Sequence, residues 1–291
     1  MLYFFAQEEK ASIFALSIKN CMKRKRLYFI SLCGMLIAGI LLTFSGCKKK
    51  KEYPETPFTQ ITTKKTVRLT EGASPICTFD LTFTYANGQN KSINNAINQV
   101  LIKEIFAEDS LSPKAAVDSF IKNYSLLYKT QTAALYKNDI KNRETNKWYS
   151  FYYILKTQQT NGGDSIICYL SDFEKFEGGP QAYHVKRWLN FNKENGKRIT
   201  LDTIFKPGYE SVLSELLLKK LMEKYNFKNE NALHTAGFLN NAEMYPSDNY
   251  QIKEHAIVFL YNASEIAPYT AGETELTISL DDMEDWLKNK D

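Results

Sequence analysis

The sequence predicts an α+β fold in which antiparallel sheets carry helices packed on one face, arranged as two small sub-domains. Strand-like stretches follow one another with tight turns between them, which favours antiparallel pairing. Other stretches repeat apolar residues with the period of an amphipathic helix. The chain also holds eighteen Tyr and eighteen Phe residues, and aromatic side chains are enriched in strands.

The N-terminal region has the order of segments that marks a secretory signal. Four cations, Lys23–Arg26, precede an apolar run, Leu27–Phe44, and two small residues then stand directly before Cys47. A cysteine in that place is typical of bacterial lipoproteins, in which the thiol accepts a diacylglycerol and becomes the new N-terminus. We therefore expect residues 1–46 to be an upstream extension plus a signal peptide, with Met22 as the true start.

An uncleaved membrane span is the alternative interpretation of the apolar run. A spanning helix needs about 20 apolar residues, and this run is shorter and includes Tyr28, Ser31 and Thr43. The small residues before Cys47 favour a lipid anchor instead. The protein is therefore expected outside the cytoplasm, tethered by lipid to a bacterial cell membrane, with the outer membrane, on its periplasmic or surface face, as the expected place.

The first part of the mature chain is predicted to be a linker followed by a companion sub-domain. Residues 47–60 contain two prolines and no periodicity, which indicates an extended lipidated linker. Residues 61–155 form the expected N-terminal α+β sub-domain. Its elements are strands at Lys65–Leu69 and Ile76–Tyr85, a helix marked by Ile93, Ile97 and Leu101, and a helix that begins at Ser112-Pro113, an N-cap followed by proline.

Residues 156–291 form the expected C-terminal sub-domain, entered through a hairpin. Its strands, Trp148–Thr157 and Ser165–Phe176, flank the turn signal Asn161–Asp164. The later elements are a strand at Ala182–Phe191, a helix at Tyr209–Tyr225 with Leu213, Leu216 and Leu217 buried, a strand at Ala256–Tyr261 buried on both faces, a half-buried strand at Thr274–Leu280 and a short acidic helix.

The folded part of the chain is mildly acidic. Ten of the 37 Lys and Arg residues and two of the 33 Asp and Glu residues precede Glu52, which leaves 27 cations against 31 anions, a balance of −4. A nucleic-acid partner would need a basic stripe, so this class of partner is disfavoured.

Cysteine and histidine give little sign of chemistry. Cys77 and Cys168 remain in the mature part, and the sequence leaves open whether they pair or stay as two buried thiols. The histidines are His184, His234 and His255; none has a partner at metal-ligand spacing, and His184 stands isolated on a predicted strand. No motif for a catalytic residue, a metal or a cofactor is recognised.

The C-terminal half carries a specific pattern. It consists of FEGGP, then NFNKENGKRITLDTIFKPG, a leucine-rich helix, and IVFLYNASEIAPYTAGETELTISL. This stretch resembles the RsiV-like extracytoplasmic family, which has a domain of unknown function, usually preceded by a second small one. Members include the outer part of RsiV-type anti-sigma factors, which binds lysozyme, and an N-terminal part of some peptidoglycan deacetylases. Where the family has Ala-His-Gly after two glycines, this chain has Pro180-Gln181-Ala182.

Two loops are the expected ligand contacts. The first is represented by Gly178, Gly179 and Tyr183, and the second by Glu265, Pro268 and Tyr269. Functional residues often lie on loops held by rigid strands. The alternative is that proline and glycine only shape the second turn while its tyrosine packs over the sheet.

Two functions from different classes remain. The first is a non-enzymatic, lipid-anchored cell-envelope binding protein; the resemblance implies lysozyme or peptidoglycan as its partner. The second is an envelope glycan hydrolase, which would need two carboxylates about 5–9 Å apart in a cleft. The resemblance favours the first function, and we expect no enzymatic activity.

Overall fold

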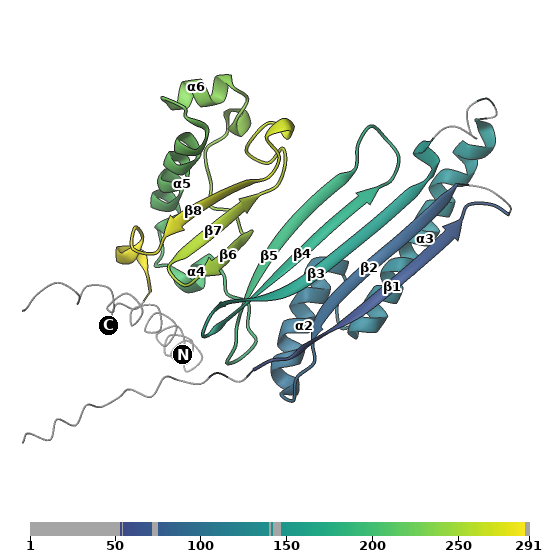
Figure 1. Ribbon diagram of the computed structural model, residues 1–291, viewed down its shortest axis with the longest axis horizontal. Coiled ribbons are helices and arrows are strands. Elements are labelled where there is room, and N and C mark those ends of the chain that lie inside the picture. Colours follow the sequence, from purple (N-terminus) through teal and green to yellow (C-terminus); the bar gives the residue numbers. More distant parts are fainter. Residues whose placement is uncertain (1–52, 54, 72–74, 140, 142–146, 289–291) are drawn as a thin grey trace, which may run out of the picture.

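The protein is described by a computed structural model that covers residues 53, 55–71, 75–139, 141 and 147–288 (Figure 1). The described residues form two β-sheets with several helices, so the predicted α+β fold is confirmed. Cys47 and the predicted signal lie outside the described residues. No helix in the described ranges combines the length and the hydropathy needed to cross a bilayer.

The first sheet has five strands and is mostly antiparallel. Its strands and the helices between them are β1 (Phe58–Arg68), β2 (Ile76–Ala86), α2 (Lys91–Phe106), α3 (Pro113–Asn138), β3 (Phe151–Gly163), β4 (Ile166–Phe176) and β5 (Tyr183–Asn192). The strand order is β1-β2-β3-β4-β5, and only β2 and β3 are parallel. This pair needs a long crossover, which α2 and α3 supply. The tight turns in the sequence predicted only antiparallel neighbours.

One face of the first sheet is covered by α2 and α3. Strand alternation places Cys77, Phe79, Leu81 and Phe83 of β2 on this face, and all four side chains are buried. The side chain of Ser112 accepts a hydrogen bond from the backbone N–H of Ala115, so the predicted start of α3 is confirmed.

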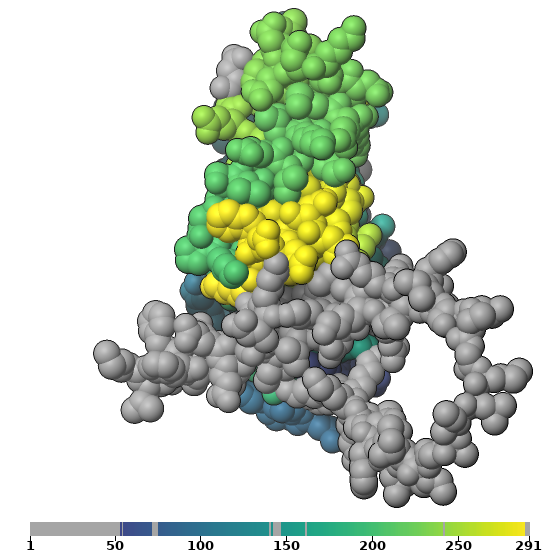
Figure 2. Space-filling view, turned by 90° about the vertical axis from the view of Figure 1, so that its left-hand side faces the viewer, coloured from purple at the N-terminus to yellow at the C-terminus, as the bar shows by residue number. Residues whose placement is uncertain are grey.

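The second sheet is antiparallel and carries its own helix. Its strands are β6 (Tyr250–Lys253), β7 (Ala256–Tyr261) and β8 (Thr274–Ser279); before them come α4 (Leu201–Ile204), α5 (Tyr209–Tyr225) and α6 (Glu230–Thr235). Figure 2 shows the side of the molecule where the green helical region adjoins the yellow C-terminal segment. The predicted burial of Leu213 and Leu217 is confirmed, but Leu216 is only half-buried. Its position lies on the flank of the i, i+4, i+8 stripe that faces the sheet.

The two hydrophobic cores meet at β4 of the first sheet, because alternate side chains of this strand face different cores. Ile167 and Tyr169 belong to the core under α2 and α3, whereas Ile166 and Cys168 belong to the core of the second sheet. The second sheet therefore packs on the face of the first sheet that the helices leave open. The position between residues 155 and 156, taken above as a sub-domain boundary, lies inside β3, and the first core continues to Phe191.

Several predicted element ends differ from the structure. Strand β1 begins at Phe58, inside the predicted linker, because its antiparallel pairing with β2 extends to Ala86. Trp148 lies in a 3-10 helix, η2 (Lys147–Tyr149), before β3. The hairpin strands continue through the glycines, so its turn is Asp164-Ser165. The acidic C-terminal helix is one 3-10 turn, η5 (Glu284–Trp286).

Cys77 and Cys168 are free and buried. Cys77 faces the core under the helices, and Cys168 faces the core of the second sheet. Burial raises the pKa of each thiol from 9.0 to about 12. Of the two alternatives left open by the sequence, the structure has the buried thiols.

Candidate functional site

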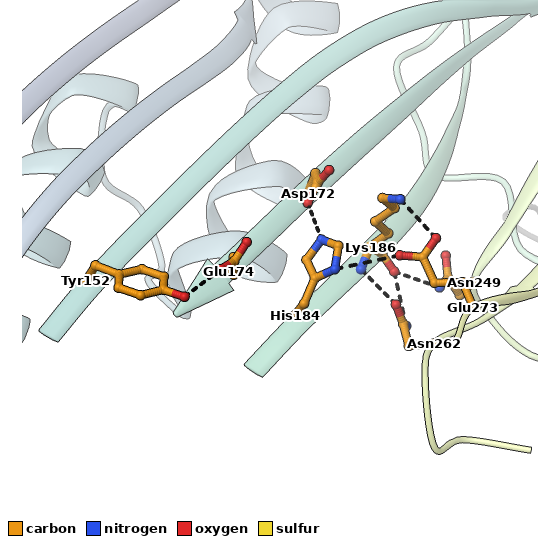
Figure 3. A network of polar contacts seen from close by, with 8 residues as sticks. All are labelled: Tyr152, Asp172, Glu174, His184, Lys186, Asn249, Asn262 and Glu273. Carbon is orange, nitrogen blue, oxygen red and sulfur yellow. Dashed lines mark hydrogen bonds and ion pairs between the residues drawn. The ribbon is translucent and has the colours of Figure 1, made fainter. Parts of the chain in front are cut away.

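A network of polar side chains lies on the face of the first sheet opposite α2 and α3 (Figure 3). Strand alternation places Asp172 and Glu174 of β4 on this face, and pairing with β5 sets Lys186 and His184 opposite them. The residues at positions i and i+2 of each of the two strands therefore lie side by side on one face of the sheet. The network lies where the first sheet approaches the loops of the second.

His184 is held between two carboxylates. Its Nε2 atom lies 2.6 Å from Oδ1 of Asp172, and its Nδ1 atom lies 3.8 Å from Oε1 of Glu273. The prediction that His184 stands isolated on its strand is wrong. Asp172 lies on the neighbouring strand and Glu273 precedes β8, so both contacts come from the tertiary fold.

Lys186 continues the network across the two sheets. Its ammonium group lies 2.9 Å from Oε2 of Glu273, the carboxylate that also faces His184. The hydrogen bond that Lys186 donates to Glu273 raises the pKa of Lys186 above its ordinary value, although partial burial acts in the opposite direction. Lys186 is therefore cationic at neutral pH.

Tyr152 and Glu174 extend the network toward the middle of the sheet. The Tyr152 hydroxyl donates a hydrogen bond of 2.6 Å to Oε1 of Glu174, and this bond raises the pKa of Tyr152 to about 12. Both residues also line an open groove of about 610 Å³ over β1–β4. The same groove contains the ion pair between Lys64 and Asp80, with a distance of 3.0 Å.

Two asparagines close the outer edge of β5 beneath this network. Asn249 Oδ1 accepts a hydrogen bond from Trp188 N at 2.7 Å, and Asn249 Nδ2 donates to Lys186 O at 2.8 Å. Asn262 Oδ1 accepts from Lys186 N at 2.8 Å. These amides bond to backbone groups that another strand would otherwise pair with. The backbone that carries Lys186 is therefore fixed between the two sheets.

The network is suited to recognition of a polar partner. Each of its three carboxylates has a partner: Asp172 has His184, Glu174 has Tyr152, and Glu273 has Lys186. The side chains of His184 and Asp172 are partly open to solvent. Among the described residues, no group of three or more His, Cys, Asp or Glu side chains is arranged to hold a metal ion.

The first predicted contact loop lies at the turn between β4 and β5. Gly178 and Gly179 have φ angles of +82° and +114°, which favour glycine, and both line a second groove beside Trp148. Tyr183 is the first residue of β5 and is exposed. His184, the next residue, belongs to the polar network.

The second predicted contact loop connects β7 to β8. Glu265 accepts hydrogen bonds from the Tyr245 hydroxyl and from Asn262 N, each at 2.8 Å. Pro268 precedes a 3-10 turn, η4 (Tyr269–Ala271), and Tyr269 is exposed. Glu265 thus contacts the network through Asn262, whereas Gly178 and Gly179 line a different groove.

None of the network residues was among the ligand contacts predicted from the sequence. Its charged members besides His184 are Asp172, Glu174, Lys186 and Glu273. A signal for three of them was present, because the predicted strands around residues 174 and 184 each carry polar residues at alternate positions. The register that sets Asp172 opposite Lys186 was not predicted, and Glu273 is distant in sequence.

The C-terminal part of the chain is similar to a protein family of unknown function. Residues 202–281 match the family model described as "Protein of unknown function (DUF3298)". A solved DUF3298 family member from Bacteroides fragilis NCTC 9343 is 25% identical, with a TM-score of 0.75, over 81% of this chain and 95% of that one. A DUF3298 family protein from Pseudomonas aeruginosa PAO1 is 14% identical, with a TM-score of 0.55, over 81% and 96%. The second likeness concerns the fold alone.

No curated protein matches the chain. The family match and the solved DUF3298 structure confirm the resemblance to a domain of unknown function. Its link to RsiV-type proteins and the lipid anchor stay predictions.

Proposed function

We propose that this chain is a non-enzymatic protein of the bacterial cell envelope, tethered by lipid at Cys47, that binds an envelope partner. The polar network between the sheets is the proposed contact surface. The observation that carries the proposal is the row of charged side chains from Glu174 to Glu273, partly exposed and held in place by mutual contacts. Such a surface recognises a complementary pattern of charges.

The partners of the carboxylates support binding rather than hydrolysis. A glycosidase needs one carboxyl group that gives up a proton and a second that attacks sugar or activates water. Here Asp172 is bonded to His184, and Glu174 accepts a short hydrogen bond from Tyr152. These contacts orient the groups as a fixed surface.

A cationic protein is the partner class that the charge balance favours. The folded part carries a net charge of −4, since 27 cations face 31 anions after residue 51. A small negative charge attracts a cationic protein at long range, and salt weakens that attraction. The family resemblance implies lysozyme or peptidoglycan, and of these lysozyme is the cationic protein.

An envelope glycan hydrolase is the second candidate, and one observation favours it. Asp172 and Glu174 stand two residues apart on β4 and face the same side of the sheet. In that case purified protein would cleave peptidoglycan, and Asp172→Asn would abolish the cleavage.

Calorimetry of the full chain in detergent distinguishes these functions. Lysozyme and soluble muropeptides are titrated separately, and peptidoglycan turnover is measured on the same preparation. Saturable binding without turnover is the expected result. Binding of neither ligand would contradict the proposed partners, and release of soluble glycan would contradict the non-enzymatic proposal.

A further inference from the structure

A second groove lies at the end of the first sheet, away from the polar network. It has a volume of about 530 Å³ and is bounded by the C-terminal part of α3, by η2 and by the turn after β4. The turn contributes Gly178 and Gly179, two residues predicted from the sequence as ligand contacts. Neither the polar network nor the proposed protein partner accounts for this groove.

Two apolar side chains of the groove are exposed. Trp148 is 58% exposed and Leu135 is 63% exposed, and both line the groove. A single exposed apolar residue on a protein surface is ordinary. Two of them at one groove, one with a large indole ring, offer a flat apolar platform to a ligand.

The polar part of the groove contains two anchored carboxylates. Asp139 accepts a hydrogen bond of 2.8 Å from the Tyr149 hydroxyl. Glu177 accepts bonds of 2.7 Å from the Tyr153 hydroxyl and from Lys175 Nζ. A carboxylate has about four acceptor positions, so Glu177, which accepts two hydrogen bonds, keeps the capacity to accept from a ligand hydroxyl. The amide side chains of Gln131 and Asn138 lie on the same lining.

The turn at Gly178 packs closely against η2, the 3-10 helix that contains Trp148. A Cβ atom at Gly178 would lie 2.9 Å from the carbonyl oxygen of Trp148, and the φ angle of +82° also disfavours a side chain. The turn and η2 can approach this closely only because residue 178 is glycine. This close packing forms one side of the groove, and Glu177 and Trp148 both line it.

We propose that this groove binds an uncharged saccharide, with one sugar ring stacked on the Trp148 indole. A sugar ring presents polarised C–H groups on its face, which the electron-rich face of an aromatic ring attracts. Its hydroxyl groups lie at the rim, where the carboxylates and amides of the groove accept and donate hydrogen bonds. Ligand sites commonly combine an apolar floor with a few convergent polar groups.

The composition of the lining argues against other ligand classes. Among the described residues that line the groove there is no Lys, Arg or His, whereas two carboxylates are present, so an anionic ligand is disfavoured. An amphipathic helix would require a longer row of apolar contacts at helical spacing. The saccharide proposal does not depend on the proposed function, because it concerns a different surface.

The test is a titration of the full chain in detergent with neutral oligosaccharides of N-acetylglucosamine, followed by calorimetry and by tryptophan fluorescence. The wild type should bind saturably. Trp148→Ala should weaken binding by about three- to tenfold, the value of one aromatic contact. Trp148→Phe keeps a ring and should weaken binding less. Leu135→Ala should weaken binding, whereas Leu126→Ala should not, although Leu126 on the same helix is 62% exposed.

Three results would overturn the proposal: no binding by the wild type, equal affinity of Trp148→Ala and wild type, or preferential binding of an apolar peptide. Circular dichroism of each variant confirms that it is folded. Asp172→Asn, in the polar network, should leave saccharide affinity unchanged. A wild type that binds the saccharide but not lysozyme would therefore count against the proposed function alone.

Discussion

Asn190 joins the two sheets through its side chain, since its Nδ2 atom donates a hydrogen bond of 2.7 Å to the carbonyl oxygen of Tyr250. The Oδ1 atom of the same amide accepts from Ile252 N at 3.1 Å. Asn190 is 2% exposed. One buried amide therefore pairs with the backbone of β6 as a neighbouring strand would.

Replacing Asn190 should destabilise the protein as a whole. Asn190→Ala removes both hydrogen bonds and leaves Tyr250 O and Ile252 N without this partner, at a cost of about 2 kcal/mol or more. Urea unfolding of the variant measures this loss. Asn123→Ala, on the exposed surface of α3, serves as the matched control and should change stability by at most about 0.5 kcal/mol. Equal midpoints for both variants would contradict this role for Asn190.

Leu213 and Leu216 should differ in their contributions to stability. Leu213 is fully buried in the second core, whereas Leu216 is half-buried on the flank of α5. Leu213→Ala should cost about 2–5 kcal/mol, because it removes apolar contacts and leaves a cavity. Leu216→Ala should cost clearly less in the same unfolding experiment. A larger loss for Leu216 would show that α5 is rotated relative to the sheet.

The buried thiols should make stability fall at alkaline pH. Their pKa values are raised from 9.0 to about 12 in the folded state, so the folded protein holds these protons more tightly than the unfolded chain. Their stabilising contribution is complete below pH 9 and is lost as the pH rises toward 12. Site-resolved alkylation at pH 8 should leave Cys77 and Cys168 unmodified until urea unfolds the protein. Rapid alkylation of either thiol in the native state would contradict their burial.

Lipidation at Cys47 predicts a specific fractionation. The wild type should incorporate labelled palmitate and sediment with membranes. Cys47→Ala should lose the label and either leave the membrane fraction or accumulate as a larger precursor. Cys33→Ala, within the apolar run, is the control and should behave as wild type. A Cys47→Ala protein of mature size that stays in the membrane fraction would refute the anchor.

Local signals in the sequence predicted the elements well. Helix α5 has the predicted bounds, because Leu213, Leu217 and Leu221 repeat with helical period between a glycine and an asparagine. Strand β7 is central and buried, as its continuous apolar run indicated. The parallel pairing of β2 with β3 could not be seen locally, because it depends on how two intervening helices return the chain.

Only part of the candidate site could be predicted from the sequence. Glycines 178 and 179 mark a turn, and the structure places them at the Trp148 groove. The contact of His184 with Asp172 depends on strand register, and the contact of Lys186 with Glu273 joins residues 87 positions apart. Pairs of this kind produce no recognisable spacing pattern in the sequence. Trp148 itself was assigned to a strand, so its exposure in a 3-10 helix was not predicted.

The binding role of the polar network is tested most directly by the affinity of Asp172→Asn for lysozyme, measured by calorimetry on the full chain in detergent at low salt. Asp118→Asn is the matched control, since its carboxylate pairs with Lys114 on the exposed surface of α3. Wild type and Asp118→Asn should bind lysozyme equally, and Asp172→Asn should bind about tenfold more weakly, a difference of about 1.4 kcal/mol. Equal affinity of all three proteins, or no binding by any of them, would contradict the binding role of the polar network.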